Sequence, residues 1–188
     1  GIVSLAERAT CPLMWSHYGD QHRGICVGYS IPDDEAQNLL LKVQYGGSRA
    51  VPASLLSRML RGDVSAEAEL DAAVLGVKAR SWAYEREWRL IDARGLQNSP
   101  MEIEEIIFGM RCEAAVKFTV ARALEKRKRP VKLFEMSELA GTFRLRKTQL
   151  DTDEMFAVLP MRYRDVLESF ENLDLEVIRN PGLARALE

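Results

Sequence analysis

The sequence predicts an α+β fold, with a mixed or split β-sheet core and helices packed against it. Short apolar segments typical of strands alternate with longer segments in which apolar residues recur every three or four positions, as in helices. The 188 residues are 47% hydrophobic and 29% charged, an ordinary balance for one main globular domain. A chain of this length can bury a core without disulfides or metals.

Seven strands are expected from short apolar runs and from alternation. Within residues 24–29, Ile25, Val27 and Tyr29 share one face, while Cys26 and Gly28 share the other. The small residues on the second face allow another group to approach closely. The expected strands lie near 2–5, 24–29, 43–45, 87–92, 103–108, 131–136 and 142–148.

Helices are expected between these strands, and residues 10–22 are expected to be irregular. Residues 52–61 carry four apolar side chains at helical spacing, and the glycine that follows them is typical of a helix C-terminus. Pro32 and the three acidic residues after it are typical of a helix start. The expected helices begin at 32 and span 52–61, 65–80, 113–128 and 162–171, with another near the C-terminus.

The net charge limits the expected binding partners, and the cysteine content indicates the cellular compartment. The net charge of -2 gives no global field that would attract nucleic acid, and the basic residues 126–129 are interpreted as cations at a helix C-terminus. Three widely spaced cysteines suit a reducing cytoplasm better than a disulfide framework. No signal peptide and no membrane-spanning run is recognised. We therefore expect a cytoplasmic protein without a membrane or nucleic-acid partner.

The segment from Trp82 to Arg89 contains the candidate catalytic residues. Strand alternation places Glu87 and Arg89 on one face, and Glu85 joins them if the strand begins early. Two glutamates spaced in this way can position a sugar hydroxyl and stabilise a nearby positive charge. The alternative is a half-buried strand whose glutamates form structural ion pairs with Lys78 or the neighbouring arginines.

The segment 13–24 is the candidate ligand-binding segment and holds both histidines of the chain. Trp15 and Tyr18 can stack on a planar base or nicotinamide, while His17 and Arg23 can contact phosphate or ribose. The alternative is that Trp15 and His17 are core residues and Arg23 lies in a turn. No metal site is expected, because the histidines are not accompanied by ligands at a known metal-binding spacing.

Packing expectations connect these two segments. Trp15, Trp82 and Trp88 are expected to be largely buried, because burying an indole is strongly favourable. His17 is expected to lie at the cleft that holds Glu87, with Tyr18 close by.

An ordered series of motifs resembles a bacterial family, the domain of unknown function 2971 (DUF2971). The motifs are residues 4–5, 13–18, 22–29, 43–45, Lys78 with 82–89, and 103–109. The resemblance covers about residues 1–148, which implies a core at 1–148 and a helix-rich extension at 149–188. Members of that family usually carry an N-terminal segment with a tyrosine-rich strand and an Asn-Asp-Pro motif. The natural protein is therefore expected to begin upstream of Gly1.

A second resemblance, at the level of fold, is to ADP-ribosyltransferase-like domains, which cleave the nicotinamide–ribose bond of NAD. Those domains have a serine-bearing strand near the nicotinamide and a later strand that starts with Glu-x-Glu. The resemblance implies that Ser4 contacts the ligand and that Glu85 and Glu87 are catalytic. It also implies NAD as the substrate, with no bound cofactor assigned.

Two other classes of function remain open at this point. One is a non-catalytic nucleotide-binding or partner-binding sensor module that uses the same aromatic residues. The other is a structural interaction domain in which residues 149–188 dock on a protein partner.

Overall fold

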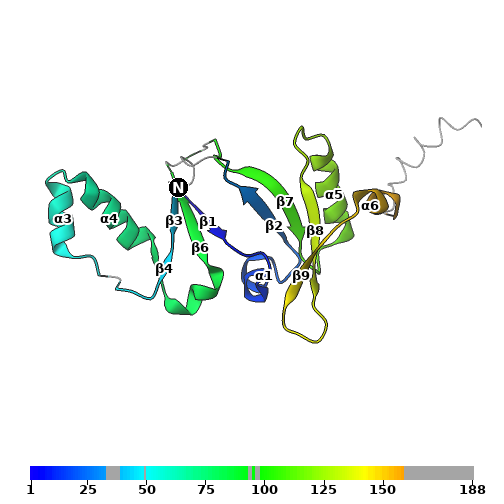
Figure 1. Cartoon of the computed structure of the whole chain (residues 1–188), viewed down its shortest axis with the longest axis horizontal. Coiled ribbons are helices and arrows are strands. Elements are labelled where there is room, and N and C mark those ends of the chain that lie inside the picture. The colour runs from blue at the N-terminus through cyan, green and yellow to red at the C-terminus, as the bar shows by residue number, and fades with distance from the viewer. Residues whose placement is uncertain (33–38, 49, 93–94, 96–97, 159–188) are drawn as a thin grey trace, which may run out of the picture. The chain divides into compact units, whose positions relative to one another are not determined.

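The computed structural model describes residues 1–32, 39–48, 50–92, 95 and 98–158, and its helices and sheets confirm the α+β class (Figure 1). The chain divides into two compact units, residues 1–152 and 153–188. Among the described elements, the strands and the helices other than α6 lie in the first unit, and α6 (Thr152–Val158) starts at its last residue. The role expected for residues 149–188 stays a prediction.

A three-stranded antiparallel sheet carries the candidate catalytic residues. Its order is β1-β6-β3, with β1 (Ile2–Ala6), β6 (Glu87–Ile91) and β3 (Leu40–Lys42). In this register Ser4 lies opposite Arg89, and Ala6 lies opposite Glu87. Residues that lie opposite each other in adjacent strands point to the same face. The Ser4 side chain therefore shares a face with Arg89 and, by alternation, with Glu87.

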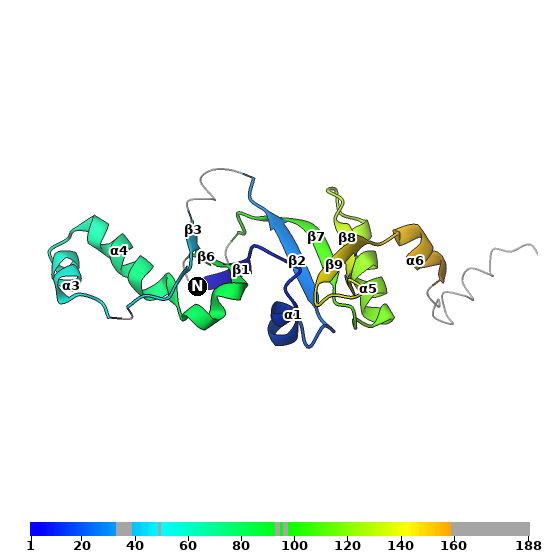
Figure 2. The same ribbon diagram turned by 60° about the horizontal axis from the view of Figure 1, so that its bottom comes forward.

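A four-stranded mixed sheet forms the other main layer. Its order is β2-β7-β8-β9, with β2 (Ile25–Ser30), β7 (Glu102–Phe108), β8 (Lys132–Glu138) and β9 (Leu145–Gln149). Strands β7 and β8 are parallel and are connected through helix α5 (Ala114–Glu125), as a parallel pair requires. Figures 1 and 2 show α5 beside β8.

A helical hairpin is inserted between two short strands. The parallel pair β4 (Gln44–Tyr45) and β5 (Val77–Lys78) lies at the base of helices α3 (Ala53–Leu60) and α4 (Val64–Leu75). Asp63 caps α4 by accepting a hydrogen bond from the Ser65 backbone. The hairpin brings β5 back beside β4, which places Lys78 next to Tyr45 in the ladder.

One cluster of the core lies on the face of the four-stranded sheet that α1 (Pro12–Tyr18) covers. Ile106, Phe108 and Leu133 are also buried and, by strand alternation, lie on the other face. Trp15 of α1 packs with Ile107 of β7 and Met136 of β8, and its indole donates a hydrogen bond to the Ala9 carbonyl. Trp15 is only 3% exposed, as expected. The expectation holds less fully for Trp82 and Trp88, which are partly buried.

Several elements differ from the sequence predictions. Residues 10–22 contain helix α1, because Pro12 occupies its first turn and Trp15 anchors it to the sheet. The helix expected at 65–80 ends at Leu75, where Gly76 is the C-cap. Its last residues instead form β5 and the start of a 3₁₀ helix, η1 (Arg80–Glu85). The helices expected from 32 onward and at 162–171 lie outside the described residues.

Within the described ranges, none of the helices combines the length and the apolar character that crossing a bilayer requires.

Candidate functional site

Glu85 and Glu87 are the two buried charged residues among those described, with 4% and 5% of their surfaces exposed. Glu85 is the last residue of η1, and Glu87 is the first residue of β6. Arg86 between them is left-handed, with φ 48°, so the chain turns sharply there. This turn allows both carboxylates to reach one cation although they do not belong to one continuous strand.

Four hydrogen bonds hold the Glu87 carboxylate. One oxygen, Oε1, accepts from the Ser4 hydroxyl at 2.7 Å and from Arg89 Nε at 2.8 Å. The other, Oε2, accepts from Lys78 Nζ at 2.9 Å and from Arg89 Nη2 at 3.3 Å. These donors come from three strands, β1, β5 and β6, so the position of this carboxylate depends on both the three-stranded sheet and the β4–β5 pair.

Glu85 is held by fewer groups. Its Oε2 pairs with Lys78 Nζ, and its Oε1 accepts a hydrogen bond from the Tyr18 hydroxyl at 2.8 Å. Lys78 therefore bridges the two carboxylates, and together with Arg89 it balances their two negative charges. A buried set of charges is tolerated only when it is paired and hydrogen-bonded in this way.

Two contacts with backbone groups fix Arg89 and the start of β6. The Tyr45 hydroxyl accepts a hydrogen bond from the Glu87 backbone N–H at 2.7 Å, and Arg89 Nη1 donates to the Leu75 carbonyl at the end of α4. The end of α4 and the strand β4, which precedes the hairpin, thus both contribute to the site.

The charges of the site are set by this network. Burial raises the pKa of Glu87, but the hydrogen bonds from Arg89, Ser4 and Lys78 outweigh it and hold the pKa at about 2. Burial lowers the pKa of Lys78, yet its contacts with Glu85 and Glu87 leave the net shift upward. The hydrogen bond to Glu85 raises the pKa of Tyr18. At neutral pH, Glu87 is ionised and Lys78 is charged.

Four aromatic rings lie next to the carboxylates. His17 packs against Trp82 at 5.9 Å and Tyr84 at 6.5 Å between ring centroids, and Tyr18 lies 6.3 Å from His17. Lys78 Nζ lies 5.3 Å from the centre of the Trp82 ring. Tyr18 remains 61% exposed while it contacts buried Glu85. The site therefore has a buried ionic part and an accessible aromatic part.

The structure brings together most of the candidate residues proposed from the sequence. Ser4 bonds to Glu87 and Tyr18 bonds to Glu85, and Lys78 links these two pairs. His17 joins them through its contact with Tyr18. Arg23 instead pairs with Asp20 in an exposed turn.

Trp15 does not belong to the aromatic part of the site. It packs in the core, where its ring stacks on His22 at 6.2 Å. Among the described residues, no group of three or more His, Cys, Asp or Glu side chains is arranged to hold a metal ion.

The sequence analysis did not propose three residues that contact the site in the structure: Tyr45, Trp82 and Tyr84. Tyr45 lies in the short motif at residues 43–45, and both other rings lie in the motif that holds the glutamates. The motifs marked these residues, but only the fold shows that Tyr45 fixes the backbone of Glu87.

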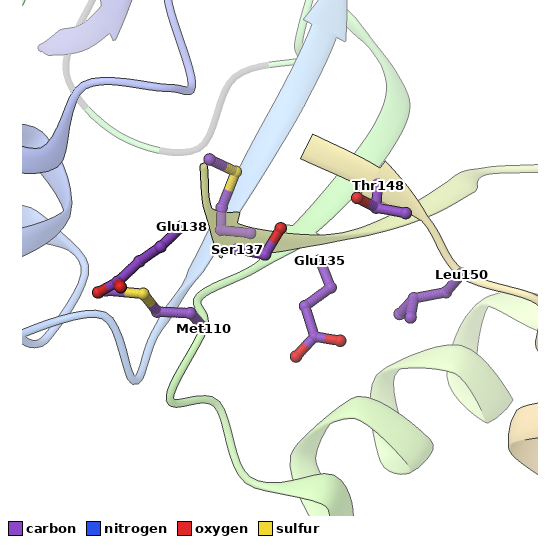
Figure 3. Close-up of a pocket in the computed structure, with 7 residues that line it drawn as sticks. Met110, Glu135, Ser137, Glu138, Thr148 and Leu150 are labelled. Carbon is purple, nitrogen blue, oxygen red and sulfur yellow. The ribbon is translucent and has the colours of Figure 1, made fainter. Parts of the chain in front are cut away.

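Two cavities lie away from the carboxylates. One, of about 540 Å³, lies along β8 and β9, with Met110 and Glu138 on one side and Thr148 and Leu150 on the other (Figure 3). The other, of about 1030 Å³, lies between β1 and β2 and is lined by Trp88, on the opposite face of β6 from Glu87. Of the linked candidate residues, only Ser4 borders either cavity.

Comparison with protein families finds a match over a part of the chain that contains most of the linked site residues. Residues 14–90 match the DUF2971 family model. This confirms the resemblance to DUF2971 over that range, which contains Tyr18, Lys78, Glu85, Glu87 and Arg89. The DUF2971 family is described as a protein of unknown function, so the match carries no activity with it. No curated protein and no solved structure matches the chain.

Proposed function

We propose that this protein cleaves the nicotinamide–ribose bond of NAD and transfers ADP-ribose to an acceptor or to water. The observation that supports this most is the 2.7 Å hydrogen bond from Ser4 on β1 to Glu87 at the start of the adjacent β6, with Glu85 two residues earlier. The resemblance to ADP-ribosyltransferase-like domains implies a serine strand paired with a strand that starts with Glu-x-Glu. Here the second glutamate, Glu87, starts the strand, and Glu85 ends the 3₁₀ helix before it.

The chemistry requires a fixed negative charge near the ribose. When the bond between C1′ and the nicotinamide nitrogen breaks, its electron pair leaves with nicotinamide, and C1′ becomes an oxocarbenium-like cation. The oxygen of water or of an acceptor then bonds to C1′ and loses its proton. An ionised carboxylate that is already in position stabilises this cation without reorganising. Glu87 has these properties, because its donors fix it and its pKa is about 2.

The remaining residues suit supporting roles in this reaction. The exposed rings of His17 and Tyr18 offer a surface on which a nicotinamide or adenine ring can stack. Glu85, which has fewer partners than Glu87 and contacts the accessible Tyr18, is suited to orienting the acceptor.

The test is an assay of nicotinamide release from NAD, with a melting curve for each variant. We expect Glu87→Gln to lower the rate by about a hundredfold or more, with little change in NAD affinity, because the carboxylate acts mainly in the transition state. Glu85→Gln is expected to reduce transfer more than hydrolysis. Glu69→Gln, in an exposed ion pair of α4, is the matched control and should retain full activity. Full activity in folded Glu87→Gln would disprove this mechanism.

One observation favours a second candidate, a non-catalytic nucleotide-binding or partner-binding module. Both carboxylates are already paired with Lys78 or Arg89, which is the arrangement of a structural ion network. Calorimetry with NAD separates the two candidates. Binding without nicotinamide release would favour the module that binds a nucleotide, while absence of binding would leave only a protein partner.

A further inference from the structure

Two strand edges in the first unit lack the protection that edge strands normally carry. Strand β1, with sequence IVSLA, ends the three-stranded sheet, and β2, with sequence ICVGYS, ends the four-stranded sheet. Neither sequence has a charged residue or a proline. Unprotected edges of this kind pair readily with other chains, so soluble proteins usually block them.

The opposite edges of the same two sheets are protected. Strand β3 has only three residues and ends in Lys42, and β9 carries Arg146 and Lys147. A short edge strand and charged side chains are the usual means of preventing edge pairing. The contrast within each sheet indicates that the edges of β1 and β2 are left unprotected for pairing.

The two unprotected edges border the same cavity. The cavity of about 1030 Å³ is lined by residues 3–9 from β1 and the chain after it, and by residues 26–29 from β2. Its other lining is largely apolar and includes Met14, Leu40 and Ile107. Val3 on β1 and Tyr29 on β2 are 49% and 42% exposed. Large apolar side chains that remain exposed at a concave surface are typical of an interaction site.

The alternation of the hydrogen bonds between β1 and β6 shows which backbone groups of β1 remain available. The Asp92 N–H donates to the Gly1 carbonyl and the Glu7 N–H donates to the Arg86 carbonyl, so odd-numbered residues of β1 bond to β6. In an antiparallel ladder the intervening residues direct their N–H and C=O groups to the other side. The backbone N–H and C=O groups of Ile2, Ser4 and Ala6 therefore point to the free edge, where they can bond to another strand.

The same reasoning applies to β2. The Gly109 N–H donates to the Gly24 carbonyl, so Cys26 and Gly28 bond to β7, and Ile25 and Val27 direct their backbone groups outward. Within the described residues, neither β1 nor β2 pairs with another strand on its outer side.

We propose that an extended segment of a partner polypeptide binds in this cavity as an additional strand on the free edge of β1. Only an extended backbone supplies donors and acceptors at the two-residue spacing that Ile2, Ser4 and Ala6 present. A cavity of this volume accommodates a ligand or a short peptide but not the edge of a second sheet, which argues against a second copy of this chain. The segment carries apolar residues at alternate positions, which pack on Trp88 and the other apolar lining.

The immobilised protein is used to select binding peptides from a displayed library of random short peptides. A selected peptide is then the probe, and its binding is measured by fluorescence anisotropy. We expect selected peptides to have alternating apolar residues. Hydrogen exchange followed by NMR should show that peptide binding protects the Ser4 and Ala6 amides, whereas the Val3 and Leu5 amides are already protected without it. N-methylation of the peptide residues that face β1 is expected to weaken binding by about tenfold or more.

Two variants block the edge without removing a β1–β6 hydrogen bond. Ala6→Pro removes an outward N–H, and Val3→Lys places a charge in the apolar cavity; each is expected to weaken binding by about tenfold or more. The matched controls are Gln149→Pro, at an outward position of β9, and Val116→Lys, on exposed α5; both should bind normally. If Ala6→Pro does not fold, Val3→Lys gives the same test.

Three outcomes would overturn the proposal. One is a library that yields no binding peptide. Another is binding that leaves exchange at Ser4 and Ala6 unchanged. The third is a wild-type dimer that Val3→Lys converts to a monomer, which would assign the edge to a second copy. Nicotinamide release has no part in these measurements, so the result is independent of the proposed function.

Discussion

Two clusters of charge in this protein contain a carboxyl group with a pKa of about 2, but they differ in burial and in where the partners come from in the sequence. In the buried cluster, the bonds that Glu87 accepts from Arg89, Ser4 and Lys78 outweigh the opposing effect of burial. In the hairpin, hydrogen bonds from Ser65 and Arg58 lower the pKa of Asp63. The Glu87 side chain is 5% exposed, and the Asp63 side chain is 37% exposed.

The origin of the partners separates the two clusters further. Asp63, Ser65 and Glu69 all bond to Arg58 within one helical hairpin, and Asp63 serves as the cap of α4. Glu87 binds Ser4, which is 83 residues away in the sequence. A lowered pKa alone therefore does not identify a functional site. Burial, together with partners from distant segments, distinguishes Glu87 from a helix cap.

The largest expected effect is a loss of stability when Lys78, which bridges Glu85 and Glu87, is replaced. Lys78→Met keeps most of the side-chain volume but leaves Glu85 and Glu87 with one cation, Arg89, between them. Removing one member of a buried ion pair typically costs about 3 kcal/mol or more, and we expect a loss of this size in the free energy of unfolding, measured with urea. Arg58→Met in the exposed cluster is the control and should lose much less. Equal losses would show that burial is not the difference between the clusters.

The second prediction concerns acid. The pKa of Glu87 is about 2 in the folded protein against an ordinary value of 4.5. The depressed pKa contributes stability that is complete above pH 4.5 and is lost as the pH falls through 2, a contribution of about 3 kcal/mol. Glu87→Gln should therefore flatten the stability profile between about pH 4.5 and 2, measured by urea unfolding at several pH values. If Glu87→Gln loses as much stability between about pH 4.5 and 2 as the wild type does, this would contradict the ionised state that we assign to Glu87.

The smallest effect is expected from salt. Raising the ionic strength from about 0.01 M to 1 M shortens the screening length from about 30 Å to 3 Å, and exposed pairs are weakened most. The stability difference between wild type and Arg58→Met should shrink over this range, while the difference for Lys78→Met should persist. A salt dependence that is the same for both variants would mean that water reaches the Lys78 cluster as freely as it reaches the hairpin.

The sequence predicted the elements that a pattern of neighbouring residues determines. Alternation identified β6 and placed Glu87 with Arg89 on one face, because strand geometry repeats every two residues. It left open whether Glu85 joins the strand, because the left-handed turn at Arg86, which separates Glu85 from β6, leaves no mark on hydrophobic alternation.

The site itself was predicted only in part, for the same reason. The contacts of Tyr18 with Glu85 and of Tyr45 with the Glu87 backbone join residues 67 and 42 positions apart. Periodicity carries no information on such pairs. The motif match drew attention to these residues, and the packing of helix α1, β4, η1 and β6 in the fold brings them together.

The separation of β1 from β6 also has a consequence for biosynthesis. At the ribosome, β1 is made first but cannot pair with β6 until more than eighty further residues have been added, since Ser4 and Glu87 are 83 positions apart. Elongation at about 5–20 residues per second makes this interval roughly 4–16 seconds. Throughout it, the uncharged sequence IVSLA cannot form its ladder with β6. A nascent chain stalled before residue 87 would therefore be a ready target for chaperones and for misassembly.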